Sequence, residues 1–359
     1  MVDLDAPDAL ALDSQGLFRE LAGSPAAMDE ARAAAEAVEL TFPADAVRSV
    51  ALCGMGGSAI AGDIVAGALS ERLVKPFGVV RDYYAPGWIG ESTLTILSSY
   101  SGTTEETLTC ALQATERGAL CVSITSGGKL GAEYADQGVP TIPVPEGLQP
   151  RAALLRILVP VVVLLERCEA ITASGADLDE ARQTVADAVA AMAPEVPTAS
   201  NPAKQLAHQL LDAVPMVWGA EATAAVARRW KTQLNENAEV PAFWSELPEL
   251  DHNEIVGFPG MGPLEQVVKV VSLRDERQHR QVQRRFDLTH ELVRPHVAGV
   301  LTAAAEGRSP LARALDLVIL GDYTSLYLAL LRGLDPGPVA MIERLKGSMA
   351  TTPYGRTAD

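Results

Sequence analysis

Hydroxyl side chains gather directly after an apolar segment in the first third of the chain. The run Ile96-Leu97-Ser98-Ser99-Tyr100-Ser101-Gly102-Thr103-Thr104-Glu105-Glu106 has the pattern of a strand that enters a turn and then opens a helix. The first backbone N–H groups of a helix lack partners and carry the positive end of the helix dipole, so they attract an anion. Ser99, Ser101 and Thr104 add neutral donors, which suit a phosphate monoester that is bound and then released. The segment predicts a phosphate site for a small metabolite.

The same residues also fit an ordinary helix start. Ser and Thr are preferred N-caps, and a Glu in the first turn completes a capping box. This segment alone therefore leaves both interpretations open.

A second segment of the same kind precedes it. Val50-Ala51-Leu52-Cys53-Gly54-Met55-Gly56-Gly57-Ser58 is an apolar strand followed by a glycine-rich turn, and glycine lets a ligand approach the backbone closely. Two such turns in one α/β domain would lie at the carboxyl ends of parallel strands, where open sheets bind ligands. A dinucleotide fingerprint is the competing interpretation, because Gly54-Met55-Gly56 follows a strand. Asp82, however, comes 28 residues after Gly54, which is late for that motif, and the Ser99 segment would stay unexplained.

Two residues of the second half are candidates for proton transfer. Glu236 lies at the polar end of an expected helix, before an aromatic, Pro-containing loop with Phe243 and Trp244. Partial desolvation by that loop would raise the basicity of Glu236. His252 is a candidate acid or base near neutral pH. Composition alone favours a solvated helix-end side chain at Glu236 and fits a surface side chain at least as well at His252.

The elements that must position these residues alternate between strands and helices. Residues 1–45 predict one or two helices ahead of the first sheet. Strands are then expected near 48–53, 77–82, 93–98, 119–124 and 140–144, with helices between them. This alternation predicts an α/β fold with a doubly wound parallel sheet.

A second α/β unit is expected after a helix at 170–193. Its predicted strands are 215–219, 267–273 and 297–301, with helices from about 220, from 274 and over 309–331. The matching pattern of elements suggests two related halves. The predicted domains are a helical segment (1–45), a first domain with the phosphate loops (46–168), a helical linker (169–200) and a second domain with the candidate acid/base residues (201–359).

Composition narrows the class of protein. A chain of 359 residues with 48% hydrophobic residues can bury two cores. The 29 Lys and Arg against 46 Asp and Glu give a net charge of -17, which argues against nucleic acid as a partner. The acidic start Met1-Val2-Asp3-Leu4-Asp5 lacks the basic region of a signal peptide, so we expect a cytoplasmic protein.

No membrane partner is expected either. The longest apolar run, Ile157 to Leu165, contains Pro160 and is too short to span a bilayer, which needs about 20 helical residues. It predicts a buried helix. The four cysteines, Cys53, Cys110, Cys121 and Cys168, lack metal-ligand spacing and are expected to be buried free thiols.

Six short motifs, in this order, resemble those of a known family. They are Gly57-Ser58, Ser99-x-Ser101-x-x-Thr104, Pro150-Arg151, Asn235-Glu236-Asn237, His252-Asn253-Glu254 and Arg344-Leu345-Lys346. Together they resemble the bifunctional phosphoglucose/phosphomannose isomerases, which are built from two sugar isomerase (SIS) domains. The likeness covers roughly residues 45–350, and no single motif is specific by itself.

The resemblance implies interconversion of glucose 6-phosphate or mannose 6-phosphate with fructose 6-phosphate, through a cis-enediol and without metal or other cofactor. It implies that Glu236 is the base and that Arg151 stabilises the enediolate oxygen. His252 and Lys346 would assist ring opening, and in this family the His comes from a neighbouring subunit, which implies a homodimer. The implied phosphate-binding residues are Gly57, Ser58, Ser99, Ser101 and Thr104.

The histidines show no ligand pair of the His-x-x-x-His kind that a zinc-dependent phosphomannose isomerase would need, so no metal is expected. One departure from the family concerns the loop Asp335-Pro336-Gly337-Pro338-Val339. Bifunctional members are thought to use a small hydroxyl residue near the carboxyl-terminal Lys, and this loop has no Ser or Thr. Activity on glucose 6-phosphate, mannose 6-phosphate or both therefore stays open. The alternative function is a non-catalytic SIS protein that senses phosphosugars, which would not need Glu236.

Overall fold

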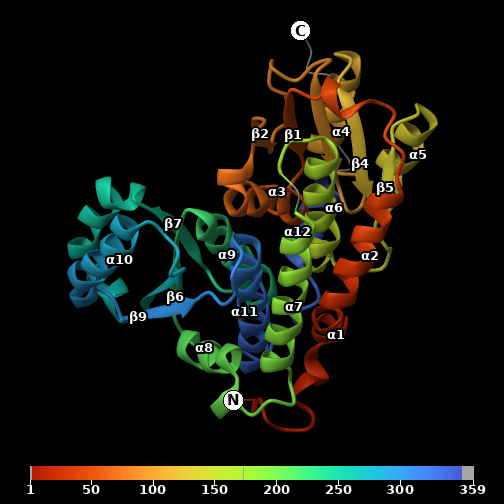
Figure 1. The fold of residues 1–359 in the computed structure, drawn as a ribbon. Helices are drawn as coiled ribbons and strands as arrows, with labels where there is room; N and C mark the ends of the chain where they lie inside the picture. Colours follow the sequence, from red (N-terminus) through yellow and green to blue (C-terminus); the bar gives the residue numbers. More distant parts are fainter. Residues whose placement is uncertain (1, 173, 350–359) are drawn as a thin grey trace.

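The computed structural model describes residues 2–172 and 174–349, which contain two parallel sheets (Figure 1). The first sheet has five strands in the order β2-β1-β3-β4-β5, and each neighbouring pair is parallel. Its strands are β1 (Ser49–Cys53), β2 (Phe77–Val80), β3 (Thr93–Ser98), β4 (Leu120–Thr125) and β5 (Thr141–Pro143). Its connecting helices are α3 (Gly56–Ala68), α4 (Glu105–Glu116) and α5 (Gly128–Asp136).

The second sheet has four parallel strands in the order β7-β6-β8-β9. They are β6 (Val214–Ala220), β7 (Phe243–Leu247), β8 (Val268–Arg274) and β9 (Gly299–Ala304). The helices of this unit are α9 (Ala222–Ala238), α10 (Arg280–Val293) and α11 (Pro310–Leu331). The predicted α/β fold with parallel sheets is confirmed.

Six further helices complete the described chain. They are α1 (Leu17–Ala22), α2 (Ser24–Ala37), α6 (Leu154–Arg167), α7 (Gly175–Met192), α8 (Pro202–Leu210) and α12 (Ala340–Met349). The apolar run 157–165 lies inside α6 and is buried, as predicted. All four cysteines are buried free thiols.

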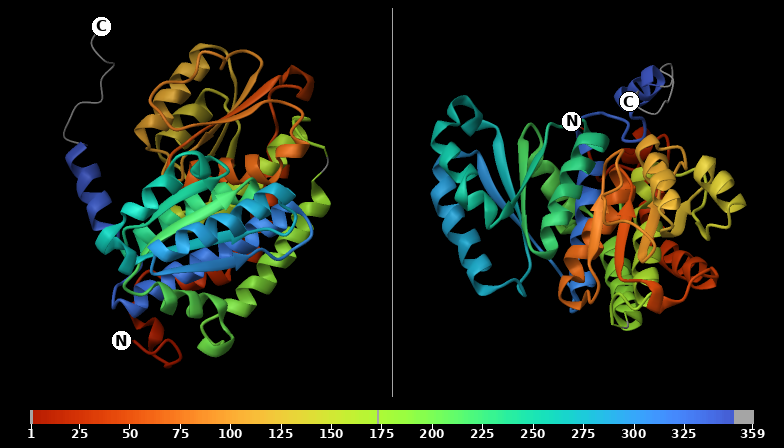
Figure 2. Two further views of the ribbon diagram at one scale, coloured as in Figure 1. Left: turned by 90° about the vertical axis from the view of Figure 1, so that its left-hand side faces the viewer. Right: turned by 90° about the horizontal axis from the view of Figure 1, so that it is seen from above.

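The core of the molecule lies between the two sheets. Figure 2 shows α3, α9 and α11 in this space, where they pack against one another. α11 has the length and hydropathy of a membrane-spanning helix, but the apolar stretch that meets this test is entirely buried within the protein. Its composition follows from that central position, because a helix surrounded by protein is apolar on all sides.

Two predictions for the second unit were wrong. The aromatic segment expected to be a loop contains β7, a short edge strand whose Phe243 is 55% exposed. An exposed edge strand that follows a proline lacks the buried apolar run by which strands are recognised. The helix expected from Arg274 begins only at Arg280, because Asp275 pairs with Arg313 and Gln278 donates to the carbonyl of Ala220, which hold the intervening loop.

Helix α12 stands apart from the body of the molecule (Figure 2). Every described residue of this helix is exposed. Its exposed residues include four large apolar side chains, Met341, Ile342, Leu345 and Met349. A short helix with an apolar face gains most of its stability from packing, so this face lacks a partner within the described chain.

Candidate active site

The two predicted phosphate loops lie side by side at the carboxyl edge of the first sheet. Strands β1 and β3 are neighbours, with Cys53 paired to Leu97, so the turns that follow them meet. A Cβ at Gly54 would lie 2.8 Å from the carbonyl oxygen of Ser98, closer than a real Cβ is found. Glycine at this position therefore allows the two turns to approach.

The hydroxyl groups of the second loop bond to one another. Ser99 Oγ and Thr104 Oγ1 are 2.9 Å apart, and Ser101 Oγ and Thr103 Oγ1 are 3.0 Å apart. Thr104 is the N-cap residue of α4, yet its side chain makes no capping hydrogen bond. The loop thus differs from the side-chain-capped helix start that was the alternative interpretation, and it collects hydroxyls beside the amino end of α4.

Arg151 joins these loops through close backbone packing. A Cβ at Gly57 would lie 3.0 Å from the carbonyl oxygen of Pro150 and 3.5 Å from the Cα of Arg151. Ser58 is the next residue of α3 and is buried. The hydroxyl of Tyr100 donates to the carbonyl of Pro145 at 3.0 Å, which ties the hydroxyl-rich loop to the segment leading to Arg151.

The Arg151 side chain is buried, with 5% of its surface exposed, and its direction is set by several acceptors. Nε donates to Asn237 Oδ1 at 2.6 Å, and Nη1 donates to Gln149 Oε1 at 3.0 Å. Nη2 donates to the carbonyls of Pro336 and Gly337. Burial lowers the pKa of the guanidinium, and the negative charge of Glu236 opposes that effect.

Glu236 therefore lies within electrostatic reach of Arg151. It is half-buried near the end of α9 and lines a groove of about 440 Å³ between that helix and the segment that starts α12. The apolar residues of this groove include Val240, Pro241 and Val339. Phe243 and Trp244, which the sequence places next to Glu236, do not line this groove: Phe243 is exposed, and Trp244 lies beneath the guanidinium of Arg228.

His252 does not join Glu236 in one chain. α9 runs back along the sheet from the end of β6 to the start of β7, so Glu236 lies at the amino edge of this sheet. His252 follows the carboxyl end of β7 and is exposed. The five residues of β7 separate the two edges by about 17 Å at the usual rise per residue.

Lys346 lies on α12 and is exposed. The start of this helix, from Ala340 to Ile342, lines the same groove as Glu236. The carboxyl-terminal lysine is thus carried by an element that begins at the site. Among the described residues, no three His, Cys, Asp or Glu side chains are grouped as metal ligands would be.

Sequence reasoning missed the residues that hold Arg151 in place. In the sequence Asn237 stands out only as part of the motif Asn235-Glu236-Asn237, and Arg229 and Asp322 belong to none of the six motifs. Arg229 donates to the carbonyl of Arg151 at 3.1 Å and forms a buried ion pair with Asp322. These contacts join segments distant in the sequence, so local pattern could not find them; the unusual polar residues inside the apolar helix α11 were the available signal.

Comparison with known proteins shows the family to which this chain belongs. Residues 199–349 match the model of the bacterial phospho-glucose isomerase C-terminal SIS domain. A bifunctional phosphoglucose/phosphomannose isomerase from Caldicellulosiruptor bescii is 37% identical over 336 residues, which cover 93% of this chain and 99% of that protein. The chain belongs to the bifunctional phosphoglucose/phosphomannose isomerase family.

Other members and structures extend this comparison. The family member from Aquifex aeolicus is 36% identical over 83% of this chain and 89% of its own length. The crystal structure of a glucose-6-phosphate isomerase like protein from Thermus thermophilus shares the fold, with a TM-score of 0.65 and 22% identity over 97% of this chain and 99% of that chain. The resemblance stated from six short motifs is confirmed.

Proposed function

We propose that this protein is a phosphosugar isomerase that interconverts glucose 6-phosphate, mannose 6-phosphate or both with fructose 6-phosphate through a cis-enediol. The names of its relatives support this class of reaction. The observation that supports the proposal is that Arg151 packs against Gly57 of the first phosphate loop and is also influenced by the negative charge of Glu236.

The substrate phosphate binds where the two loops meet. Ser58, Ser99, Ser101 and Thr104 supply hydroxyls there, and Gly57 lets the turn that carries Arg151 pack closely against this site. The amino ends of α3 and α4 add N–H groups and the positive ends of two helix dipoles. Neutral donors of this kind hold the phosphate without a permanent ion pair and let the product leave.

Glu236 acts as the base. It removes the proton from C2 of the aldose and returns it to C1, so that both carbons use one carboxylate. The enediolate oxygen carries negative charge that develops mainly in the transition state, and Arg151 stabilises that charge. Among the described residues, Arg151 commits four of its five N–H groups to protein acceptors, so one N–H of Nη1 is left for the substrate.

His252 acts in the site of a second copy of this chain. The distance along β7 between the two edges supports this arrangement, because one chain cannot bring His252 to its own Glu236 without moving the sheet. The exposed apolar face of α12 also favours a second copy, since burying Met341, Leu345 and Met349 would stabilise a helix that is otherwise unsupported. Lys346 on this helix then assists His252 in opening the sugar ring.

The choice between the two aldoses concerns the loop at 335–339. This loop lies at the site, because the carbonyls of Pro336 and Gly337 accept hydrogen bonds from Arg151. It carries no hydroxyl side chain, and its one polar side chain, the Asp335 carboxylate, accepts from the backbone N–H of Gly337 at 2.9 Å.

A coupled assay tests this function. The purified protein is given glucose 6-phosphate and mannose 6-phosphate separately, and fructose 6-phosphate formation is followed with and without EDTA. We expect turnover of at least one sugar that resists EDTA. No turnover of either sugar, with phosphosugar binding still visible as a rise in Tm, would favour the alternative of a phosphosugar sensor.

A further inference from the structure

Two tethers connect Arg151 to helix α11. In the first, Arg151 Nε donates to Asn237 Oδ1 at 2.6 Å, and Asn237 Nδ2 donates to Ser325 Oγ at 2.9 Å. Ser325 Oγ in turn donates to the carbonyl of Asp322 at 2.7 Å. Asn237 is 2% exposed and Ser325 is completely buried, so solvent does not compete for these bonds.

The second tether holds the backbone of Arg151. Its carbonyl accepts from Arg229 Nη2 at 3.1 Å, and Arg229 pairs with Asp322 through bonds of 3.0 Å and 2.6 Å. Asp322 and Ser325 are three residues apart and therefore lie on the same face of α11. One face of a buried helix thus helps to hold both the backbone and the side chain of Arg151, whose Nη1 and Nη2 groups donate to Gln149 and to the loop at 336–337.

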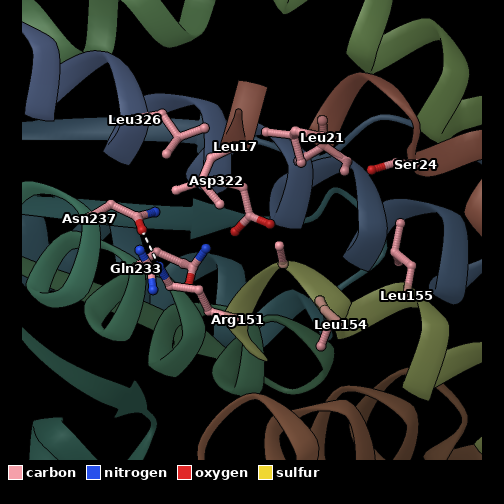
Figure 3. A pocket seen from close by; sticks show the side chains of 12 residues that line it. Leu17, Leu21, Ser24, Arg151, Leu154, Leu155, Gln233, Asn237, Asp322 and Leu326 are labelled. Carbon is pink, nitrogen blue, oxygen red and sulfur yellow. Dashed lines mark hydrogen bonds between the residues drawn. The ribbon is translucent and has the colours of Figure 1, made fainter. Parts of the chain in front are cut away.

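Other hydrogen-bond acceptors lie near the Arg151 side chain and compete with Asn237 for its guanidinium. Arg151, Asn237, Gln233 and Asp322 line one cavity of about 30 Å³, whose lining also includes leucines of α1 and α6 (Figure 3). Gln233 Oε1 is buried there and has no hydrogen-bond partner among the described residues. If the bond to Asn237 were lost, the guanidinium could turn toward this free acceptor and toward the Asp322 carboxylate.

We propose that Asn237 is a positioning residue that, with Ser325, fixes the plane of the Arg151 guanidinium. Because the guanidinium is planar, the bond at Nε also sets the direction of the one uncommitted N–H on Nη1. That N–H then points to where the enediolate oxygen develops, and the charge is stabilised without rearrangement in the transition state. This inference rests on the proposed function of Arg151.

A purely structural role for Asn237 makes a different prediction. A buried amide that only holds α9 against α11 would, when removed, loosen the whole site and weaken phosphate binding as much as turnover. A residue that acts through Arg151 would lower kcat and leave the phosphate loops intact. The two roles are separated by a double-mutant cycle.

The cycle compares the wild type with Asn237→Ala, Arg151→Ala and the double variant. For Asn237→Ala we expect kcat to fall roughly 10- to 100-fold, with KM changed by less than about threefold. A phosphosugar hydroxamate that mimics the enediolate should lose affinity by a similar factor, and inorganic phosphate should bind as to the wild type. In the Arg151→Ala background, adding Asn237→Ala should change kcat by less than about twofold.

Two further variants complete the test. Asn237→Asp keeps an oxygen that can accept from Arg151 Nε and should recover part of kcat. Ser309→Ala is the matched control, because Ser309 Oγ caps the first turn of α11 through Ala312 N at 3.2 Å, at the opposite end of the helix from Ser325. This control should lower Tm while leaving kcat near the wild-type value.

Three results would overturn the proposal. The first is an unchanged kcat for Asn237→Ala. The second is that Asn237→Ala lowers kcat by the same factor in the Arg151→Ala background as in the wild type. The third is that Asn237→Ala lowers the affinity for inorganic phosphate by as much as it lowers kcat. A wild-type protein that turns over neither sugar would instead overturn the proposed function, and this inference with it. If the wild type turns over a sugar and Asn237→Ala does so equally fast, the positioning role of Asn237 is refuted and the proposed function stands.

Discussion

Gly57 faces the carbonyl oxygen of Pro150 so closely that a Cβ at position 57 would lie 3.0 Å from that oxygen. This contact joins the first turn of α3 to the turn that carries Arg151. It brings a phosphate-binding element and the proposed enediolate-stabilising cation into one rigid unit. A side chain at position 57 would force the two turns apart by a few tenths of an ångström.

Gly57→Ala is therefore expected to weaken phosphate binding. The added methyl group moves the amino end of α3 away from the turn that carries Arg151, so KM for the phosphosugar should rise about tenfold. The affinity for inorganic phosphate should fall in parallel, which isothermal calorimetry can measure. Gly87→Ala is the matched control, because a Cβ at Gly87 meets no atom within 4 Å. Unchanged phosphate affinity in Gly57→Ala would place the phosphate elsewhere.

His290 predicts a pH dependence of stability. It is buried beneath the second sheet, where its Nε2 lies 2.6 Å from Ser272 Oγ. Burial lowers its pKa from 6.5 to about 4; Arg274 and Arg294 add to the effect, and Asp287 opposes it. Below pH 6.5 the unfolded chain gains a proton that the folded protein takes up only near pH 4. Stability is therefore lost as pH falls through this window.

The His290→Gln variant tests this linkage. Between pH 7 and pH 4.5, the wild type should lose about 2 to 3 kcal/mol of unfolding free energy that the variant does not lose. Urea unfolding at the two pH values measures the difference. His208→Gln, which removes an exposed imidazole, should behave as the wild type does. A gap between wild type and His290→Gln that stays constant with pH would contradict the assignment.

Asp251 fixes the turn that ends in His252. Its carboxylate accepts from Arg285 Nη1 at 3.0 Å and from Thr289 Oγ1 at 2.8 Å, which clamps the turn to α10. Asp251→Ala should free His252 and lower kcat roughly tenfold while phosphate affinity is kept. Asp287→Ala is the control. Asp287 lies on α10, as Arg285 and Thr289 do, but it is exposed and pairs with Arg274. A wild-type kcat for Asp251→Ala would show that the clamp does not matter for ring opening.

The parts of the fold that could be predicted from the sequence are those with local signals. β1 and β3 are rich in apolar residues and end in glycine- and serine-rich turns, so both strands and their loops were predicted. β7 was missed because an exposed edge strand lacks such a run. The bond between Asn237 and Ser325 joins residues 88 positions apart, and only the packing of α9 on α11 creates it.

The separation of Glu236 from His252 in one chain predicts complementation between subunits. Glu236→Gln and His252→Asn should each be nearly inactive alone. Mixed dimers, formed by co-expression, contain one site with both native residues, so activity should return to about a quarter of the wild-type value if subunits pair at random. Co-expression of Glu236→Gln with itself is the control. No recovery in mixed dimers would mean that both residues come from the same chain.

The most direct test of the central claim is solvent exchange at the substrate carbon. The wild-type protein, incubated with fructose 6-phosphate in D₂O, should place deuterium at C2 of the aldose phosphate and at C1 of the recovered ketose. Glu236→Gln should abolish this incorporation while the phosphosugar still raises its Tm. Incorporation by Glu236→Gln at the wild-type rate would contradict Glu236 as the base and, with it, the mechanism proposed for this site.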